Sequence, residues 1–238
     1  MPSNIAHSNR FIALLPREVG QHLLSVSESV DLVSGEVIGA PWKLISHVYF
    51  PTESYIALGL QAGRDGRLGL AIVGSEGMYG IPLALGIPAV SMWHAVVEGS
   101  GHAWRVDAAR FHQALQKSEV LQQGMNRYIH VRMHQLAQLA FCNRFHLVEQ
   151  RFARLLLLTR DCAHSSEFHI THEHLAQLLG VRRVGVTKAA VALQKQKLIH
   201  YSRGNVRILD SAGLESAACG CYREERETYQ RLLCNPSG

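Results

Sequence analysis

Three basic side chains, Arg182, Arg183 and Lys188, lie close together in the last third of the chain. An arginine guanidinium can donate two hydrogen bonds to the O6 and N7 atoms of guanine, and lysine or arginine can neutralise a phosphate. Gly185 lies between them and has no side chain, so on an exposed face it would let the backbone approach the floor of a groove. These residue types predict a surface that binds nucleic acid, through base contacts or through phosphate contacts alone.

The segment around these residues is predicted to form two helices and a hairpin. Thr171 is a suitable N-cap for a short helix that ends at Gly180, where a left-handed residue is needed. A second helix is predicted from about Arg182 through Lys195. A strand, a tight turn and a second strand follow over residues 198–209. This order of elements predicts a helix-turn-helix followed by a basic hairpin.

The positions that a helix-turn-helix requires carry suitable residue types. Ala176 is small where the two helices cross, and Val186 with Leu193 supplies the inner face of the second helix. Residues 184–187 are weak helix formers, so tertiary packing must hold this helix. An unrelated helical hairpin is the alternative, but the combined spacing of these residues with Gly180 disfavours it.

Further candidate contacts flank the second helix. Arg203 and Arg207 on the predicted hairpin suit the DNA backbone beside a groove, and His172 at the N-terminus of the first helix suits a phosphate. The complete set of candidate DNA-binding residues is Arg182, Arg183, Gly185, Thr187, Lys188, His172, Arg203 and Arg207.

The charge distribution separates two parts of the chain. Residues 1–109 hold 6 basic and 9 acidic residues, whereas residues 110–238 hold 18 basic and 10 acidic residues. Residues 171–213 alone carry 7 basic and 2 acidic residues, a concentration that a polyanion-binding face requires. An ordinary solvated basic face is the alternative interpretation.

The composition is that of a globular protein. The chain has 238 residues, of which 47% are apolar and 18% charged, so it can bury a core and is not a disordered tail. It has no uncharged apolar stretch of about 18 residues and no signal-peptide pattern, so we expect a cytoplasmic protein with no membrane partner. Its five cysteines are an odd number, which does not fit a secreted disulfide framework, and reduced thiols are expected.

The N-terminal part is predicted to be rich in short strands. Runs of β-branched and aromatic residues, such as 48–50, 55–58 and 68–73, are separated by Gly- and Pro-bearing turns over residues 31–106. Many short strands at this spacing predict a sandwich or a barrel. Residues 14–24 before them fit a short amphipathic helix.

Long helical segments without proline are predicted between residues 107 and 162. One apolar stripe in them advances by 4, 4, 3 and 4 residues, as the face of a helix does. The stripe consists of Met125, Ile129, Met133, Leu136 and Ala140. We interpret it as the contact of a parallel homodimer, with packing on the chain's own core as the alternative. His130 and His134 could ligate a metal from one helix face, although most such pairs are not ligands.

Taken together, the chain resembles the CRP/FNR family of bacterial transcription regulators, most strongly over Ile170 to Leu209. The resemblance implies an α+β fold with an N-terminal antiparallel β-roll (a cupin-like barrel), a long dimerisation helix and a C-terminal winged helix-turn-helix. The implied parts are a cyclic-nucleotide-binding-like effector domain at 1–109, the dimerisation helix and hinge at 110–145, the DNA-binding domain at 146–211 and a helical extension at 212–238. The resemblance also implies a homodimer on a palindromic operator in double-stranded DNA, with half-sites about one helical turn apart, and RNA polymerase as a further candidate partner.

The recognition helix departs from the family pattern. Many members place Arg, Glu and Arg on this helix. Arg183 and Lys188 match the first and last of these sites, but Val184 stands where the acid would accept a hydrogen bond from cytosine, so a different operator is expected. Arg182 replaces the usual Ser-like cap, so no capping residue fixes the start of this helix.

The effector domain departs further. The segments 80–82 and 90–92 correspond to the family's ribose and cyclic-phosphate site but lack its Glu and Arg, so cyclic AMP is not expected as the effector. An apolar pocket could be lined by Met78, Tyr79, Leu83, Leu85, Met92 and Trp93, although core packing is the favoured interpretation. No cysteine precedes Cys142, which excludes the N-terminal iron–sulfur centre of the oxygen-sensing members. The small-molecule effector is left open.

The helical extension carries Cys219 and Cys221, which could form a redox pair or half of a metal site. Inert thiols are the favoured interpretation, and no metal, cofactor or enzymatic activity is assigned. The leading prediction is a sequence-specific DNA-binding regulator. One alternative is a metal- or redox-responsive protein that uses this pair, or an enzyme that uses the pair with His169, His172 and His174. The other alternative is an RNA- or protein-binding winged-helix module.

Overall fold

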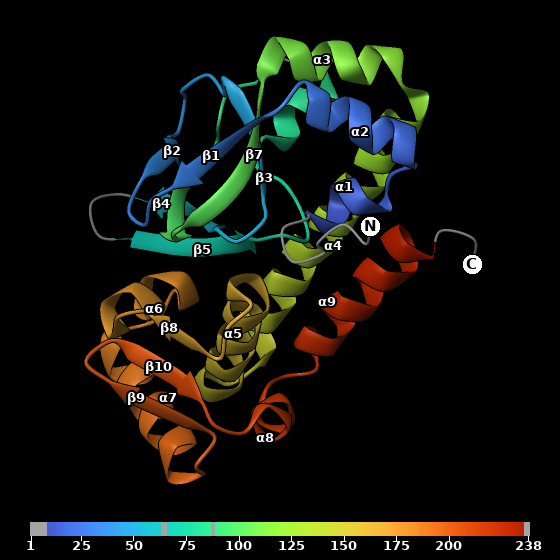
Figure 1. Cartoon of the computed structure of the whole chain (residues 1–238). Helices are drawn as coiled ribbons and strands as arrows, with labels where there is room; N and C mark the ends of the chain where they lie inside the picture. The colour runs from blue at the N-terminus through green and yellow to red at the C-terminus, as the bar shows by residue number, and fades with distance from the viewer. Residues whose placement is uncertain (1–8, 63–65, 87–88, 236–238) are drawn as a thin grey trace. The chain divides into compact units, whose positions relative to one another are not determined.

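The computed structural model describes residues 9–62, 66–86 and 89–235, which divide into two compact units. The first unit comprises Met1–Leu58, Ile72–Met133 and Tyr229–Gly238, and the second comprises Gly59–Ala71 and His134–Thr228. The colours of Figure 1 follow the order of the helices and strands along the chain. None of the helices within the described ranges combines the length and the hydropathy that crossing a membrane requires.

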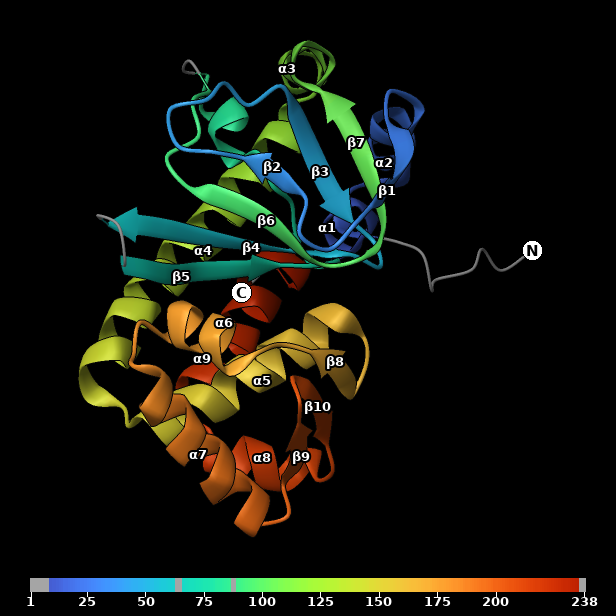
Figure 2. The same cartoon turned by 90° about the vertical axis from the view of Figure 1, so that its left-hand side faces the viewer.

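Seven strands form two sheets, as the short β-branched and aromatic runs predict (Figure 2). One sheet has the order β1-β7-β3 and the other the order β2-β6-β4-β5, and the pairs β1–β7, β3–β7 and β2–β6 are antiparallel. The strands are β1 (Glu28–Leu32), β2 (Val37–Gly39), β3 (His47–Pro51), β4 (Tyr55–Ala62), β5 (Gly66–Val73), β6 (His94–Gly99) and β7 (Gly101–Asp107). The predicted N-terminal β-roll is therefore confirmed as part of an α+β fold.

The start of the described chain forms two helices where the sequence predicts one. These are α1 (Arg10–Leu14) and α2 (Arg17–Ser25). Pro16 separates them, because a residue before proline is driven out of the helical region. Leu15 accordingly has an extended backbone, with φ −73° and ψ 152°.

Two further helices complete the first unit before the long helix. They are the 3₁₀ helix η2 (Ile81–Leu85) and α3 (Ala108–Lys117). The Asp107 carboxylate caps α3 by accepting hydrogen bonds from the backbone N–H groups of Ala109 and Arg110. The apolar core of this unit is built on buried aromatic and aliphatic side chains, which include Phe11, Leu23, Val48, Phe50, Met78, Val106 and Phe111.

The long helix α4 (Glu119–Phe145) begins inside this core. Leu121, Met125, Tyr128 and Val131 on its first half are all buried there. Gly124 permits a close approach, because a Cβ atom at this position would lie 3.1 Å from Leu15 Cδ2. The first half of α4 is therefore a core helix of the first unit.

The second unit contains the predicted helix-turn-helix and hairpin. Its helices are the second half of α4, α5 (Val148–Ala163), α6 (His172–Leu179), α7 (Arg183–Lys195), α8 (Ser211–Ala217) and α9 (Cys221–Tyr229). Its small sheet, of order β8-β10-β9, consists of β8 (Glu167–His169), β9 (Ile199–Ser202) and β10 (Asn205–Ile208). One apolar core joins helices α5 to α9 and the small sheet, and it includes Phe152, Leu156, Leu175, Val186, Leu193, Val206 and Ile208.

The C-terminal extension forms two α-helices and a π-helical turn, η3 (Gln230–Cys234), rather than the single helix expected. Ala218 ends α8 with an extended backbone, and α9 starts three residues later at Cys221. Leu214 of α8 and Tyr222 of α9 are buried in the core of the second unit. Arg154 of α5 and Glu225 of α9 form a buried ion pair, with only 9% and 7% of their side chains exposed. Residues 212–228 of the extension are thus an integral part of this unit's packing, whereas Tyr229 and Leu233 are buried in the core of the first unit.

Candidate nucleic-acid interface

Helices α6 and α7 form the helix-turn-helix. The Thr171 side chain caps α6 by accepting a hydrogen bond from the backbone N–H of His174 at 3.2 Å. Gly180 ends this helix in the left-handed conformation, with φ 63° and ψ 38°. Ala176 is buried where the helices pack, and Val186 lies in the shared core. The sequence prediction is confirmed at each of these positions.

Helix α7 has an apolar inner face and a mixed outer face. The buried residues are Val186, Ala189, Ala190 and Leu193. The exposed residues are Arg183, Val184, Thr187, Lys188, Val191 and Lys195. Val184 and Val191 are 59% and 43% exposed, and their seven-residue spacing places them on one side of the helix. The sequence analysis did not select these two valines as contacts. Their positions off the apolar inner stripe of α7 could have identified them as exposed.

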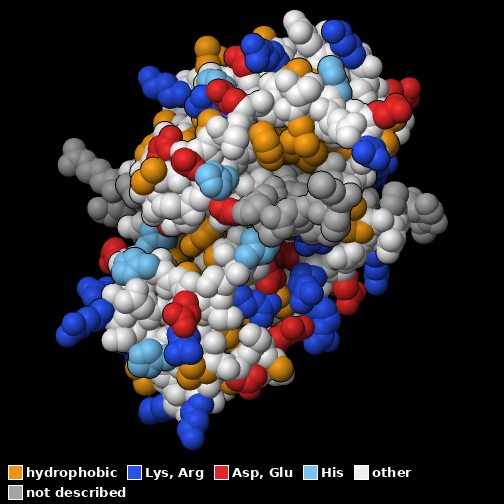
Figure 3. All heavy atoms as spheres, in the orientation of Figure 1, with side chains coloured by type: hydrophobic (Ala, Val, Ile, Leu, Met, Phe, Trp, Pro, Cys, Tyr) orange, Lys and Arg blue, Asp and Glu red, His pale blue; other side chains and the backbone are white. Residues whose placement is uncertain are grey.

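The basic residues at the start of α7 are available to a ligand. Arg182, Arg183 and Lys188 are exposed, and within the described ranges their side chains form no hydrogen bond or ion pair. Arg182 is the N-cap residue and makes no capping bond with its side chain. One anion-binding surface therefore combines these three cations with the free N–H groups and the positive dipole end of α7. Figure 3 shows Lys and Arg side chains projecting from the part of the surface where Figure 1 draws α7 and the β9–β10 hairpin.

Gly185 does not have the role expected for it. A Cβ atom at this position would meet Val148 Cγ1 at 3.8 Å and Val181 Cγ2 at 3.9 Å, so its missing side chain points towards the protein's own elements. The spacing of α7 explains this, because Gly185 lies one helical turn before the buried Ala189. Gly185 is thus removed from the groove-facing set.

His172 and Thr187 form a connection inside the helix-turn-helix. The His172 ring stacks on Tyr201 with centroids 4.5 Å apart, and its Nδ1 atom lies 3.2 Å from the Thr187 hydroxyl. Its Nε2 atom is buried and has no hydrogen-bond partner among the described residues. Burial, and then the neighbouring Arg183 charge, hold the pKa of His172 below its ordinary value. Both ring nitrogens of His172 face the protein, which contradicts the expected phosphate contact. The Thr187 hydroxyl also donates a hydrogen bond to the Arg183 carbonyl at 3.1 Å.

The hairpin has the tight turn that the sequence predicts. Arg203 and Gly204 both have positive φ, 50° and 85°, as a two-residue type I′ turn requires. A Cβ at Gly204 would also come within 2.5 Å of His169 Cε1. The turn therefore holds the exposed Arg203 side chain at the tip of the hairpin. Arg207 is exposed as well and pairs with Glu167 at 3.0 Å.

The predicted dimer stripe is only partly exposed. Met125 is fully buried in the first core, so its assignment to a dimer face is wrong. Ile129 is partly buried against the same core. Leu136 is half-buried, whereas Met133 and Ala140 are exposed. The N-terminal end of the stripe is buried because the core of the first unit covers this side of the helix there.

The second half of α4 has an exposed apolar face that the prediction missed in part. It consists of Met133, Ala137, Ala140, Phe141 and Phe145. Met133 and Phe145 are each 64% exposed, and Phe141 lies 4.7 Å from Phe145 between ring centroids. This face shares Met133 and Ala140 with the predicted stripe and continues to Phe145 at the end of the helix.

The residues considered for an effector pocket have different environments. Met78 and Tyr79 are buried, whereas Leu85 and Met92 are each 52% exposed. The Ser91 hydroxyl is buried and donates to the carbonyl of Trp93 at 2.7 Å. The prediction of core packing therefore holds for Met78 and Tyr79 but not for Leu85 and Met92.

The histidines and cysteines suggested for an enzyme do not assemble as that alternative requires. His169 lies beside Asn205, with 3.0 Å between Nδ1 and Oδ1, and His172 is stacked on Tyr201. Cys219 and Cys221 instead come together with Cys142 and His146. No local sequence pattern pairs Cys142 and His146 with the C-terminal thiols.

The helix-turn-helix region matches a known domain family. The family model of the Crp-like helix-turn-helix domain matches residues 150–217, which include α6, α7 and the β9–β10 hairpin. No curated protein matches the sequence.

Solved structures match over most of the chain. The chain is similar to CLP, a c-di-GMP responsive global regulator from Xanthomonas campestris, at 15% identity and a TM-score of 0.66, covering 81% of this chain and 99% of that one. FixK2 from Bradyrhizobium japonicum matches at 12% identity and a TM-score of 0.67, covering 82% and 98%. TTHB099, a CRP-family transcriptional regulator from Thermus thermophilus, matches at 19% identity and a TM-score of 0.63, covering 79% and 96%. The resemblance predicted from sequence is confirmed by the family model in the helix-turn-helix and by these structures at the level of the fold.

Proposed function

From the premise that this chain carries the Crp-like helix-turn-helix domain on the fold of the CRP/FNR regulators, we propose that it is a homodimeric, sequence-specific DNA-binding transcription regulator. In this proposal α7 lies in the major groove, and α7 of the second subunit reads the other half of a palindromic operator. One observation carries the proposal: α7 turns free cations and exposed methyl groups away from its own core. The proposal assigns no catalytic role to any residue. It places the protein in the cytoplasm, where a bacterial regulator binds the chromosome.

The outer face of α7 supports particular contacts. Arg183 can form paired hydrogen bonds with guanine, and the methyl groups of Val184, Thr187 and Val191 can pack on the C5-methyl groups of thymine. A valine cannot accept a hydrogen bond from the cytosine amino group. We therefore expect the operator to combine a guanine near Arg183 with thymines along the rest of the helix.

Phosphate contacts are assigned to the flanking residues. Arg182 stands beside the N–H groups of the first turn of α7, a favourable combination for an anion. Arg203 at the hairpin tip is exposed and free within the described ranges. These contacts position the helix without reading the sequence.

The exposed face on the second half of α4 supports the homodimer. Met133, Ala137, Ala140 and Phe141 recur at spacings of 4, 3 and 1 residues, which aligns them along the helix. A second copy of α4 would bury this face and bring two DNA-binding units to one operator.

The effector in this proposal is not cyclic AMP. Residues 80–82, at the start of η2, lack the acid of the family's ribose site, and residues 90–92 lack the arginine of its cyclic-phosphate site. The Ser91 hydroxyl is already engaged by the Trp93 carbonyl.

Selection of binding sites from random duplex DNA tests the proposal. The expected product is a two-fold symmetric site with half-sites about one helical turn apart, bound far more tightly than scrambled DNA and more weakly at high salt. Recovery of no preferred duplex, or stronger binding to RNA of the same length, would reject it.

A further inference from the structure

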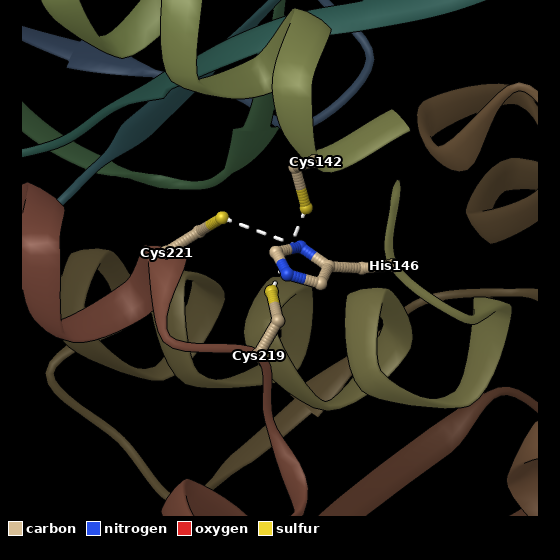
Figure 4. A group of neighbouring side chains, drawn as sticks. All are labelled: Cys142, His146, Cys219 and Cys221. Carbon is tan, nitrogen blue, oxygen red and sulfur yellow. Dashed lines mark hydrogen bonds between the residues drawn. The ribbon is translucent and has the colours of Figure 1, made fainter. Parts of the chain in front are cut away.

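Three cysteines and a histidine that DNA binding does not use come together in the second unit (Figure 4). Cys142 Sγ, Cys219 Sγ, Cys221 Sγ and a ring nitrogen of His146 all lie within 4.8 Å of one another. We call these four residues the Cys/His group. Figure 4 shows their side chains converging from two separate parts of the chain.

Local backbone structure positions each pair. Cys142 lies in the last turn of α4, and the His146 N–H donates to the Cys142 carbonyl at 3.1 Å, so the two side chains emerge one helical turn apart. Cys219 lies in the connection from α8 to α9, Gly220 follows it, and Cys221 is the first residue of α9. A Cβ on Gly220 would meet nothing within 4 Å, so that residue points into open space while its neighbours face α4.

The distances suit one small ion. The Sγ atoms of Cys142 and Cys219 are 3.5 Å apart, and Cys221 Sγ lies 3.4 Å from His146 Nδ1. A tetrahedral zinc ion with Zn–S bonds of about 2.3 Å holds its sulfur ligands about 3.8 Å from each other. These two pairs are thus near the ligand spacing of such an ion.

The surroundings of the sulfur atoms include a hydrogen-bond donor and a positive charge. The three cysteines form a buried cluster of their own, outside the large apolar core of the second unit. Gln138 donates a hydrogen bond to Cys221 Sγ at 3.1 Å. The Arg154 cation interacts electrostatically with Cys142 and Cys219. Donors and positive charge around ligating sulfurs are what a metal site requires beyond the ligands themselves.

We propose that Cys142, His146, Cys219 and Cys221 bind one Zn²⁺ ion. Three thiolates and one imidazole are a ligand set that Zn²⁺ prefers, and four protein ligands leave no position open for substrate, so the site is structural. On binding, the three thiols release their protons to solvent. The ion joins the end of α4 to the α8–α9 connection, which are 77 residues apart between Cys142 and Cys219.

A disulfide explains less of the geometry. It would use two of the three thiols and leave the third thiol and His146 without a role. The zinc proposal therefore replaces the expectation of inert thiols, and it revises the sequence-based assignment of no metal.

Metal analysis of the full-length protein, purified with a reductant and without chelators, is the primary test. We expect about one zinc ion per chain, because the four ligands surround a single position. The Cys142→Ser and Cys219→Ser variants should lose the zinc, whereas the matched controls Cys234→Ser and Gly220→Ala should keep it. A chelator should lower the melting temperature of the wild-type protein and of both controls.

Cobalt substitution of the wild-type protein keeps the test independent of variant folding. Co²⁺ should give the visible bands of a tetrahedral ion together with sulfur-to-cobalt charge transfer, and added Zn²⁺ should remove both. The proposal is overturned if reduced wild-type protein takes up neither ion. It is equally overturned by an iron–sulfur absorption spectrum in the purified protein, by a Cys142–Cys219 disulfide that persists under reductant, or by zinc retained in both serine variants.

Discussion

Helix α7 and the Cys/His group lie in the same unit and use their side chains in opposite ways. The functional side chains of α7 are exposed, and none of its three leading cations contacts another described residue by a hydrogen bond or ion pair. The cysteines of the Cys/His group are buried and contact one another across the fold. The surface of α7 is therefore made for an external partner, whereas the Cys/His group serves the protein's own structure. Substitutions in the two regions should accordingly separate DNA affinity from stability.

The largest expected effect is on stability, next to the Cys/His group. Glu225→Ala would leave the buried Arg154 guanidinium without its ion-pair partner. Removing one member of a buried pair costs about 3–5 kcal/mol of unfolding free energy. Denaturant unfolding should show this loss, while the folded fraction keeps its DNA affinity. The control Glu224→Ala removes a carboxylate that is 53% exposed and should change stability by less than about 0.5 kcal/mol. Equal effects of the two substitutions would contradict the structural role given to this region.

The next effect concerns assembly. Ala137→Arg places a charge on the exposed apolar face of α4 without removing a core side chain. Desolvating that charge in a helix contact is unfavourable, so the protein should shift towards monomer in light scattering and lose operator affinity. Gln113→Arg on the exposed side of α3 is the matched control and should remain dimeric. A dimer of unchanged stability in the Ala137→Arg protein would place the interface elsewhere.

A smaller effect is predicted at the hairpin. Arg207→Ala removes one phosphate contact, which should weaken binding to all duplexes alike and lower the slope of log affinity against log salt by about 1 per subunit. Its exposed ion pair with Glu167 contributes little to stability, so the unfolding transition should not move. Glu167→Ala is the control, and it should not reduce the salt slope. A loss confined to one operator sequence would instead make Arg207 a base-reading residue.

The smallest effect is the pH dependence of stability through His172. Because its pKa in the folded protein lies below the ordinary 6.5, the unfolded chain binds more protons as the pH falls below 6.5. This contribution to stability is complete above pH 6.5 and declines below it. Denaturation on both sides of pH 6.5 should show a smaller acid loss in His172→Gln than in the wild-type protein. An identical pH dependence would show that His172 titrates normally.

The contrast between α7 and the Cys/His group also explains what the sequence could predict. The helix-turn-helix is encoded by consecutive residues, so Thr171, Gly180 and Val186 could be assigned from spacing alone. The Cys/His group is assembled by tertiary folding, and nothing local to Cys142 indicates that Cys219 lies beside it. The dimer stripe failed at Met125 for a related reason, because periodicity identifies an apolar face but not the partner that covers it.

Within the helix-turn-helix the errors were of orientation. Gly185 was assigned to the groove by its residue type, yet it lies one turn before the buried Ala189 and its missing side chain points towards Val148 and Val181. His172 was assigned to a phosphate from its place at a helix N-terminus, but Tyr201 and Thr187 engage it first. Applying the buried spacing of α7 to its remaining positions would have selected Val184 and Val191.

The central claim is that α7 reads bases in the major groove, and the base preference of Arg183→Ala on the selected operator tests it most directly. The account predicts a loss of about 1–3 kcal/mol in binding free energy, with preference relaxed at one symmetric pair of positions and an unfolding transition like that of the wild-type protein. Unchanged affinity together with unchanged preference at every position would contradict the account.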